Sequence, residues 1–115
     1  MHEMGIAMQI IEIATESIPE DQKGVQVEKI NLKIGKLSNV VPDSLTFCFE
    51  IASKDTAVDG AILSIENIPV HARCKECSAE WTVEKPVFKC TACGSGQIKI
   101  LAGQEMDISS IELAE

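Results

Sequence analysis

The stretch CKECSAEWTVEKPVFKCTAC, residues 74–93, holds four of the five cysteines of the chain in two Cys-x2-Cys pairs. Twelve residues separate the pairs, and each can lie on a tight turn that continues into Ser78 or Gly94. Two such turns can place four thiolates around one ion at tetrahedral geometry. Zinc is the expected ion, because it accepts sulfur ligands and has no redox chemistry. The predicted zinc ligands are Cys74, Cys77, Cys90 and Cys93.

Four protein ligands leave no open position on the ion, so the predicted site is structural rather than catalytic. The segment has too few apolar residues for a core of its own, and metal binding should supply much of its folding free energy. We therefore expect a small zinc-binding domain over residues 71–99. A rubredoxin-like iron site has the same ligands, and the spacing does not distinguish the two ions. A thiol redox protein that uses the same pairs without zinc is a further interpretation.

The sequence on either side of the zinc segment predicts a second domain, residues 1–70 together with 100–115. Apolar residues recur with a helical period between Met4 and Ile18, which indicates a helix with a broad buried face that ends at Pro19. A second amphipathic helix follows within residues 40–53, with a proline near its start.

Alternating apolar residues predict strands within residues 25–37, 61–70 and 105–113. A change of phase at Glu28 and Lys29 predicts a bulge in the first of them. The expected fold is therefore α+β, with two helices packed on a small three-stranded sheet and an inserted four-cysteine, zinc-ribbon-like domain.

Composition excludes several classes of protein. The 115 residues are 45% apolar, enough for one ordinary domain with a small appendage. Eighteen acids against ten bases give a net charge of −8, which disfavours nucleic acids and anionic membrane surfaces and suits metal cations or basic partners. Aromatic residues make up only 3%. No apolar stretch approaches the ~20 residues that cross a bilayer, and the N-terminus lacks the pattern of a secretory signal. We expect a cytoplasmic protein with reduced thiols.

Four further residues invite a functional interpretation. Cys48 lies on the apolar stripe of the second predicted helix, where a small buried side chain is expected rather than a nucleophile. His71 precedes the first cysteine pair and is expected to be a partly exposed strand residue, although it can support the zinc site. Trp81 lies between the cysteine pairs and is expected to pack over the two turns, as is Phe88.

The chain begins MHEMGIA, so a histidine stands directly behind Met1 and close to a predicted helix. An α-amine with a pKa of ~8 and an imidazole with a pKa of ~6.5 can both exchange a proton for a metal near neutral pH. The His2 amide joins them into fused chelate rings, a nitrogen-rich set that suits Ni(II) or Cu(II). The amine, the His2 amide and the imidazole fill three positions of a square plane, so we expect a fourth donor. It can come from Glu3, from His71 or from a partner protein. A frayed terminus without function is the ordinary alternative.

Several motifs occur together in one order along the whole chain. They are the start MHEM-x-I-A, the strand end IGKLS, the helix opening Pro-Asp-Ser-Leu-x-Phe, the double Cys-x2-Cys insert and the tail GQEMDISSIE. In this combination the sequence resembles the HypA/HybF family of hydrogenase maturation nickel chaperones. Gly5 and Gln104 stand where that family commonly has serine and asparagine. Neither change removes a proposed ligand.

The resemblance implies a nickel metallochaperone and not an enzyme. Ni(II) is then a transient cargo held by Met1, His2 and Glu3, and Zn(II) is held structurally by the four cysteines. The implied partners are a HypB-type GTPase and the large subunit of NiFe-hydrogenase, and some members also serve urease maturation proteins. The alternative function is a zinc-ribbon protein-interaction adaptor without nickel transfer.

Overall fold

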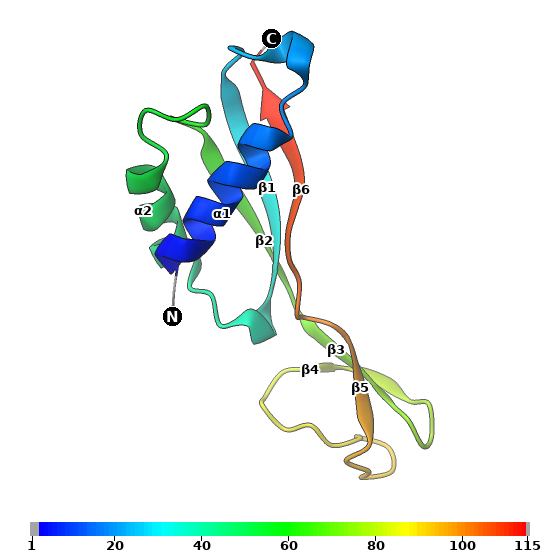
Figure 1. The fold of residues 1–115 in the computed structure, drawn as a ribbon. Helices are drawn as coiled ribbons and strands as arrows, with labels where there is room; N and C mark the ends of the chain where they lie inside the picture. The colour runs from blue at the N-terminus through cyan, green and yellow to red at the C-terminus, as the bar shows by residue number, and fades with distance from the viewer. Residues whose placement is uncertain (1–2, 115) are drawn as a thin grey trace. The chain divides into compact units, whose positions relative to one another are not determined.

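The computed structural model describes residues 3–114, which form two α-helices, two short 3-10 helices and six strands (Figure 1). Their order is α1 (Glu3–Glu16), η1 (Glu20–Gln22), β1 (Val27–Gly35), η2 (Lys36–Ser38), α2 (Pro42–Ala52), β2 (Ile62–Ile68), β3 (Val70–Cys74), β4 (Glu80–Val83), β5 (Ile98–Ala102) and β6 (Met106–Leu113). The strands form two three-stranded sheets, β2-β1-β6 and β4-β3-β5.

The chain divides into two compact units. We call the first the helical unit; it comprises the residues up to 33, residues 40–66 and the residues from 107 onward. The second, the cysteine unit, comprises residues 34–39 and 67–106. In the described part of the chain, no helix is both long and apolar enough to span a membrane.

An apolar core holds the helical unit together. Buried residues recur on α1 at spacings of three and four, which places them on one face of the helix. On α2, Leu45 and Phe49 are four residues apart and are both almost completely buried. Helices α1 and α2 are in contact, and Val27 and Ile30 of β1 are also fully buried. Figure 1 shows α1 lying across the sheet β2-β1-β6, with α2 beside it.

The α+β fold, both helices and the three-stranded sheet agree with the prediction. The breadth of the buried face of α1 was predicted wrongly, because Met4, Met8 and Ile13 are exposed. One sheet and one neighbouring helix cover only part of a helical surface, so the outermost apolar residues face solvent. Helix α1 also ends at Glu16, before the proline at position 19.

Two strands of the cysteine unit were not predicted. β4 and β5 pair with β3 on either side, and both pairings are antiparallel. The single strand expected over residues 61–70 is in fact β2 followed by β3, with Pro69 between them. Proline lacks the N–H that a continuous ladder requires, which is why one sheet ends there and another begins. The bulge expected at positions 28 and 29 stays a prediction.

Two glycines allow chain segments of the cysteine unit to cross closely. A Cβ at Gly35 would overlap the carbonyl of Gly103. Gly103 has a φ of +112°, and a Cβ there would lie 2.7 Å from Val70 Cα. The crossing is held by hydrogen bonds, because the Gly35 N–H donates to Glu105 O at 2.7 Å and the Leu37 N–H donates to Gly103 O at 2.8 Å. Side chains at either glycine position would force these segments apart.

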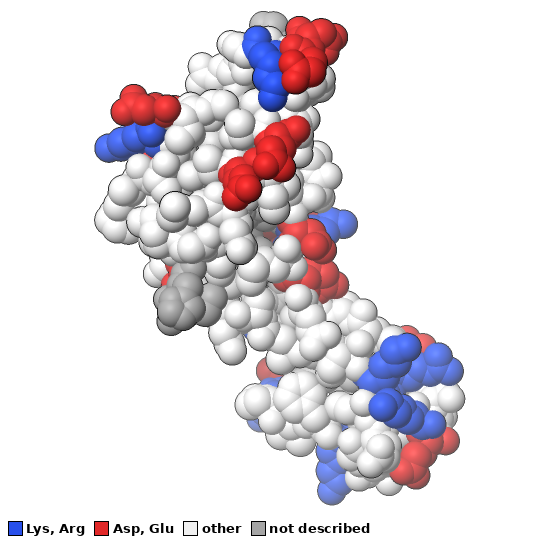
Figure 2. All heavy atoms as spheres, in the orientation of Figure 1, with Lys and Arg blue, Asp and Glu red and all other residues white. Residues whose placement is uncertain are grey.

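The negative charge of the chain is concentrated in the helical unit. That unit contains 14 acidic and 4 basic residues, whereas the cysteine unit contains 4 acidic and 6 basic residues. Figure 2 shows Lys and Arg side chains gathered on the unit that contains β3 to β5. The net charge of −8 is therefore the sum of −10 on the helical unit and +2 on the cysteine unit.

Candidate metal centre

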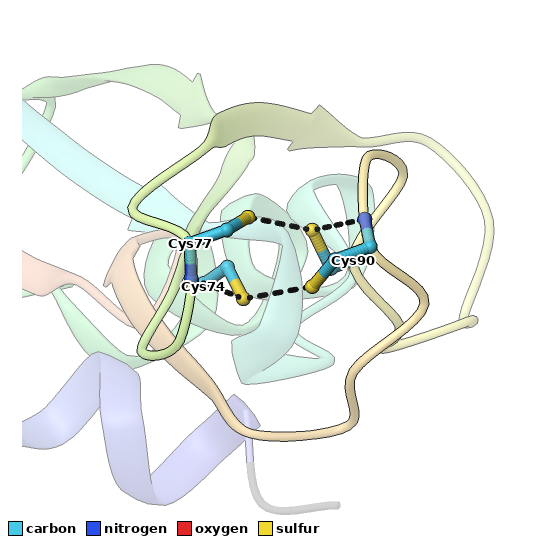
Figure 3. Close-up of side chains that lie close together, drawn as sticks. Cys74, Cys77 and Cys90 are labelled. Carbon is cyan, nitrogen blue, oxygen red and sulfur yellow. Dashed lines mark hydrogen bonds between the residues drawn. The ribbon is translucent and has the colours of Figure 1, made fainter.

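The four cysteines predicted as ligands lie together in the cysteine unit (Figure 3). Their sulfur atoms all lie within 4.8 Å of one another, and within residues 3–114 this is the one group of metal-ligating side chains that clusters in this way. Cys74 Sγ is 3.6 Å from Cys93 Sγ, and Cys77 Sγ is 3.5 Å from Cys90 Sγ. A tetrahedral ion with metal–sulfur bonds of about 2.3 Å requires sulfurs about 3.8 Å apart. The donor set therefore fits an ion of the size and geometry of zinc.

Backbone amides surround the first sulfur of each pair. The N–H groups of Glu76 and Cys77 donate to Cys74 Sγ, each at 3.4 Å. The N–H groups of Ala92 and Cys93 donate to Cys90 Sγ in the same way, each at 3.3 Å. Such amide donors stabilise a thiolate, so the turns are arranged for sulfur anions before any metal is considered.

The two turns also close in the same manner. In the first, the Ser78 N–H donates to Cys74 O at 3.1 Å, and the Cys74 N–H donates to Ala79 O at 2.8 Å. In the second, the Gly94 N–H donates to Cys90 O at 3.0 Å, and the Cys90 N–H donates to Ser95 O at 2.8 Å. Ser78 and Gly94 both have positive φ, 66° and 77°. The Cys-x2-Cys-Ser/Gly pattern is the sequence signal for this shared geometry.

The surroundings of the four sulfurs lower the pKa of two cysteines and raise the pKa of the other two. Hydrogen bonding by the Cys93 N–H, more than any other contact, lowers the pKa of Cys90 to about 6. The corresponding Cys77 N–H lowers the pKa of Cys74. At Cys93, a hydrogen bond from the Ser95 amide lowers the pKa, but the neighbouring Cys74 and Cys90 sulfurs and burial outweigh it and raise the pKa to about 12.

The pKa of Cys77 is also raised: the Ala79 amide lowers it, while the nearby Cys90 sulfur, burial and Cys74 outweigh that effect. Cys74 and Cys90, the first cysteine of each pair, therefore form thiolates more readily than the second cysteines. They are also the buried members of the pairs. A metal must displace a proton from the second, exposed cysteine of each pair.

Other residues near the cysteine pairs are not part of the cluster. His71 is half-exposed on β3, as predicted, and its Nε2 lies 3.2 Å from Glu80 Oε1. Trp81 is half-buried on β4, whereas Phe88 is 39% exposed. Cys48 is half-buried on α2, separate from the four clustered thiols.

The residues predicted to bind nickel are only partly described. Met1 and His2 lie outside the described residues. Glu3 is the first residue of α1, and its Oε2 accepts a hydrogen bond of 3.5 Å from the N–H of Val41, the residue that caps the start of α2. This contact joins the beginnings of the two helices.

Comparison with known proteins gives one consistent result. The family described as "Hydrogenase/urease nickel incorporation, metallochaperone, hypA" matches residues 1–113. A "Hydrogenase maturation factor HypA" of Desulfosudis oleivorans is 56% identical over 115 residues and covers all of both chains. A protein of the same name from Nostoc sp. is 44% identical over 115 residues, which are all of this chain and 97% of that one.

Solved structures agree with the sequence relatives. The solution structure of the Ni metallochaperone HypA from Helicobacter pylori has a TM-score of 0.70 at 27% identity, over 98% of this chain and 97% of that one. A second solution structure of a HypA protein has a TM-score of 0.72 at 26% identity, over 98% of this chain and 96% of that one. The chain belongs to the HypA family of hydrogenase/urease nickel incorporation metallochaperones.

Proposed function

We propose that this chain binds Ni(II) through the Met1 amine, the His2 backbone and imidazole, and Glu3, and delivers it for the maturation of NiFe-hydrogenase. The family's description as a nickel incorporation metallochaperone supports the cargo. The position of the site is supported by Glu3, the one proposed donor among the described residues, whose Oε2 accepts a hydrogen bond from the Val41 N–H; this contact is the observation that carries the proposal.

The position of Glu3 on α1 matters because a donor on a helix loses less conformational entropy on binding than one in a flexible segment. The hydrogen bond between Glu3 and Val41 ties the start of α1 to α2. Glu3 is therefore itself held beside α2, and its second carboxylate oxygen can complete the donor set.

The proposed donors also explain how the metal is released. Amine, imidazole and amide must all give up protons to bind nickel, so affinity falls as pH falls. A terminal site is open to a competing ligand, and nickel leaves it by ligand exchange. The proposed recipients are a HypB-type GTPase and the large subunit of NiFe-hydrogenase, with urease maturation proteins as a further route, all in the cytoplasm.

For the four-cysteine site we propose Zn(II) in a structural role. The sulfur–sulfur distances suit its radius, and four protein ligands leave no position for a substrate. Cys74, Cys77, Cys90 and Cys93 would hold the ion and thereby connect β3 to the turn that precedes β5.

The test compares the two histidines of the chain. His2→Ala should abolish stoichiometric Ni(II) binding in isothermal titration, whereas His71→Ala, which removes the half-exposed partner of Glu80, should bind nickel as the wild type does. Both variants should keep one zinc per chain and the wild-type melting temperature. A chain extended by two residues before Met1 should lose nickel binding as well, because its amine is displaced from the chelate ring.

Unchanged nickel affinity in His2→Ala would remove the N-terminal site from the proposal. If no chain with its natural start bound Ni(II), the adaptor function without nickel transfer would replace it.

A further inference from the structure

Three cationic side chains surround a hollow on the cysteine unit. The hollow measures about 210 Å³ and is lined by Arg73, Cys74, Lys75, Ser78 and Lys99. It belongs to the cysteine unit, on which Figure 2 shows Lys and Arg side chains gathered. Nothing in the proposed nickel chemistry uses these residues, so their arrangement needs another explanation.

Two of the cations face each other across a strand pair. Arg73 on β3 and Lys99 on β5 are direct partners in the antiparallel register. Like charges in such positions destabilise a sheet. Among the described residues the one ion pair joins His71 to Glu80, so no carboxylate lies within 4 Å of the Arg73 or Lys99 charge.

The nearest acids in the sequence are engaged elsewhere. Glu80 is the partner of Arg73 on β4, but its carboxylate lies 3.2 Å from His71 Nε2. Glu76 accepts a hydrogen bond of 2.9 Å from the Ser95 hydroxyl. The repulsion between Arg73 and Lys99 is thus not relieved within the unit.

Neutralising the thiolate cluster does not account for these cations. Along β3, Arg73 is exposed between Ala72 and Cys74, which are both buried. Alternation along a strand places neighbouring side chains on opposite faces, so Arg73 and its partner Lys99 point away from the Cys74 sulfur. Both side chains are exposed to solvent, where a ligand can reach them.

Ser78 marks a difference between two otherwise similar turns. It occupies the left-handed position that glycine fills at Gly94 in the second turn. A side chain in that region costs free energy that glycine avoids. The serine places a hydroxyl, which can donate a hydrogen bond, in the lining of the cationic hollow.

We propose that this hollow binds a carboxylate of an acidic, extended segment of a partner protein, which lies along the outer edge of β5. The volume accepts one small oxyanion group, and three cations with a hydroxyl provide its partners. β5 is an edge strand of the sheet β4-β3-β5, and an extended segment can add to such an edge through main-chain hydrogen bonds. Lys99 and Leu101 are both exposed and lie on one face of β5, where they can contact alternate side chains of that segment.

Other occupants fit less well. A second copy that presents the same hollow is opposed by like charge, because the cysteine unit carries 6 basic and 4 acidic residues. A free phosphate is usually held by a cradle of backbone amides at a helix N-terminus, whereas this lining consists of strand and turn residues with flexible side chains. The proposal does not depend on nickel binding.

The experiment uses the full-length, metal-loaded chain and a capped synthetic peptide, acetyl-Thr-Val-Glu-Val-Glu-Val-Thr-amide. Titration at low ionic strength, followed by two-dimensional 1H–15N NMR, should shift the amides of residues 73–78 and 98–101 in a saturable way. Arg73→Gln and Lys99→Gln should each weaken binding about threefold, and the double variant about tenfold, because exposed charges contribute modestly. Lys85→Gln removes the same charge from the loop outside the hollow and should leave the affinity unchanged.

The outcomes separate the alternatives. Equal affinity in the wild type and the double variant would overturn the proposal, as would equal binding of a peptide with lysine in place of glutamate. Inorganic phosphate that shifts the same amides while the peptide does not would reassign the hollow to free phosphate. Loss of the bound metal in the double variant would show that the cations serve the thiolate cluster instead. Self-association that disappears in the double variant would identify a second copy as the occupant.

Discussion

The helical unit and the cysteine unit reach a defined structure by different means. Twelve of the seventeen buried apolar residues among the described residues belong to the helical unit. The cysteine unit has five, and two of them are Cys74 and Cys90 themselves. A fully buried large apolar side chain contributes about 1.5–3 kcal/mol, so the helical unit can be stable by burial alone. We therefore expect the cysteine unit to depend on a bound metal.

The largest expected effect follows from removing that metal. A chelator should unfold the cysteine unit, because structural zinc contributes about 10–16 kcal/mol in comparable small sites. The amide signals of residues 71–99 should collapse in two-dimensional NMR, while those of residues 3–33 and 40–66 stay dispersed. Cys90→Ser should have the same effect, and Cys48→Ser, which alters the one cysteine outside the cluster, should not. Dispersed signals over residues 71–99 in the absence of metal would contradict the expectation that the cysteine unit depends on metal for its fold.

Acid should also release the metal from the cysteine unit while the helical unit stays folded. The pKa of Cys90 is lowered to about 6, so its thiolate persists as pH falls from 9 and is protonated only as pH falls through that value. Because protons compete with the metal for the thiolates, the metal should be retained at pH 7 and released progressively as pH falls further. A chromogenic metal indicator measures the release, and circular dichroism should show the helices intact at the same pH. Simultaneous loss of metal and helix would mean that the units unfold as one.

Core truncation should affect the helical unit instead. Phe49→Ala removes a side chain that is 1% exposed and should lower the free energy of unfolding by about 3–5 kcal/mol in urea denaturation. Phe47→Ala, on the exposed side of the same helix at 63% exposure, should change it by no more than about 0.5 kcal/mol. The metal content should be unchanged in both variants. A large effect at Phe47 would show that the exposed face of α2 is covered in solution.

The smallest of these effects concerns a backbone position in the cysteine unit. Gly103→Ala should cost about 2 kcal/mol, because φ is +112° and the new Cβ would meet Val70. Gly96→Ala serves as the control, since a Cβ there meets nothing within 4 Å. Melting temperatures of the metal-loaded proteins measure the difference. Equal melting temperatures would show that the crossing of residues 35, 70 and 103 can relax.

Prediction from sequence succeeded where the signal is local. Two cysteines three residues apart share one turn, and the pairs were expected to meet around one ion; the structure brings their sulfurs together. Helical periodicity likewise identified α1 and α2, because residues three and four apart share a face. The proposed nickel ligands at positions 1 and 2 stay a prediction, and Glu3 is placed only as a tie to α2.

Prediction failed where the outcome depends on distant segments. Short strands such as β4 carry too few alternating residues to be distinguished from a loop, and they form because β3 lies beside them. The exposure of Met8 and Ile13 depends on how much of α1 the neighbouring elements cover. The opposition of Arg73 and Lys99 depends on strand register, which no local pattern specifies.

The sequence alone therefore determined the two helices, the sheet beneath them and the four cysteines whose sulfurs cluster. Each of these follows from the spacing of apolar residues or cysteines over a few positions, which can be read directly from the sequence. Tertiary structure decided which apolar residues stay exposed, where Gly35 and Gly103 allow segments to cross, and which cations meet around one hollow. Those outcomes require residues far apart in the chain to come together, and only packing and strand register bring that about.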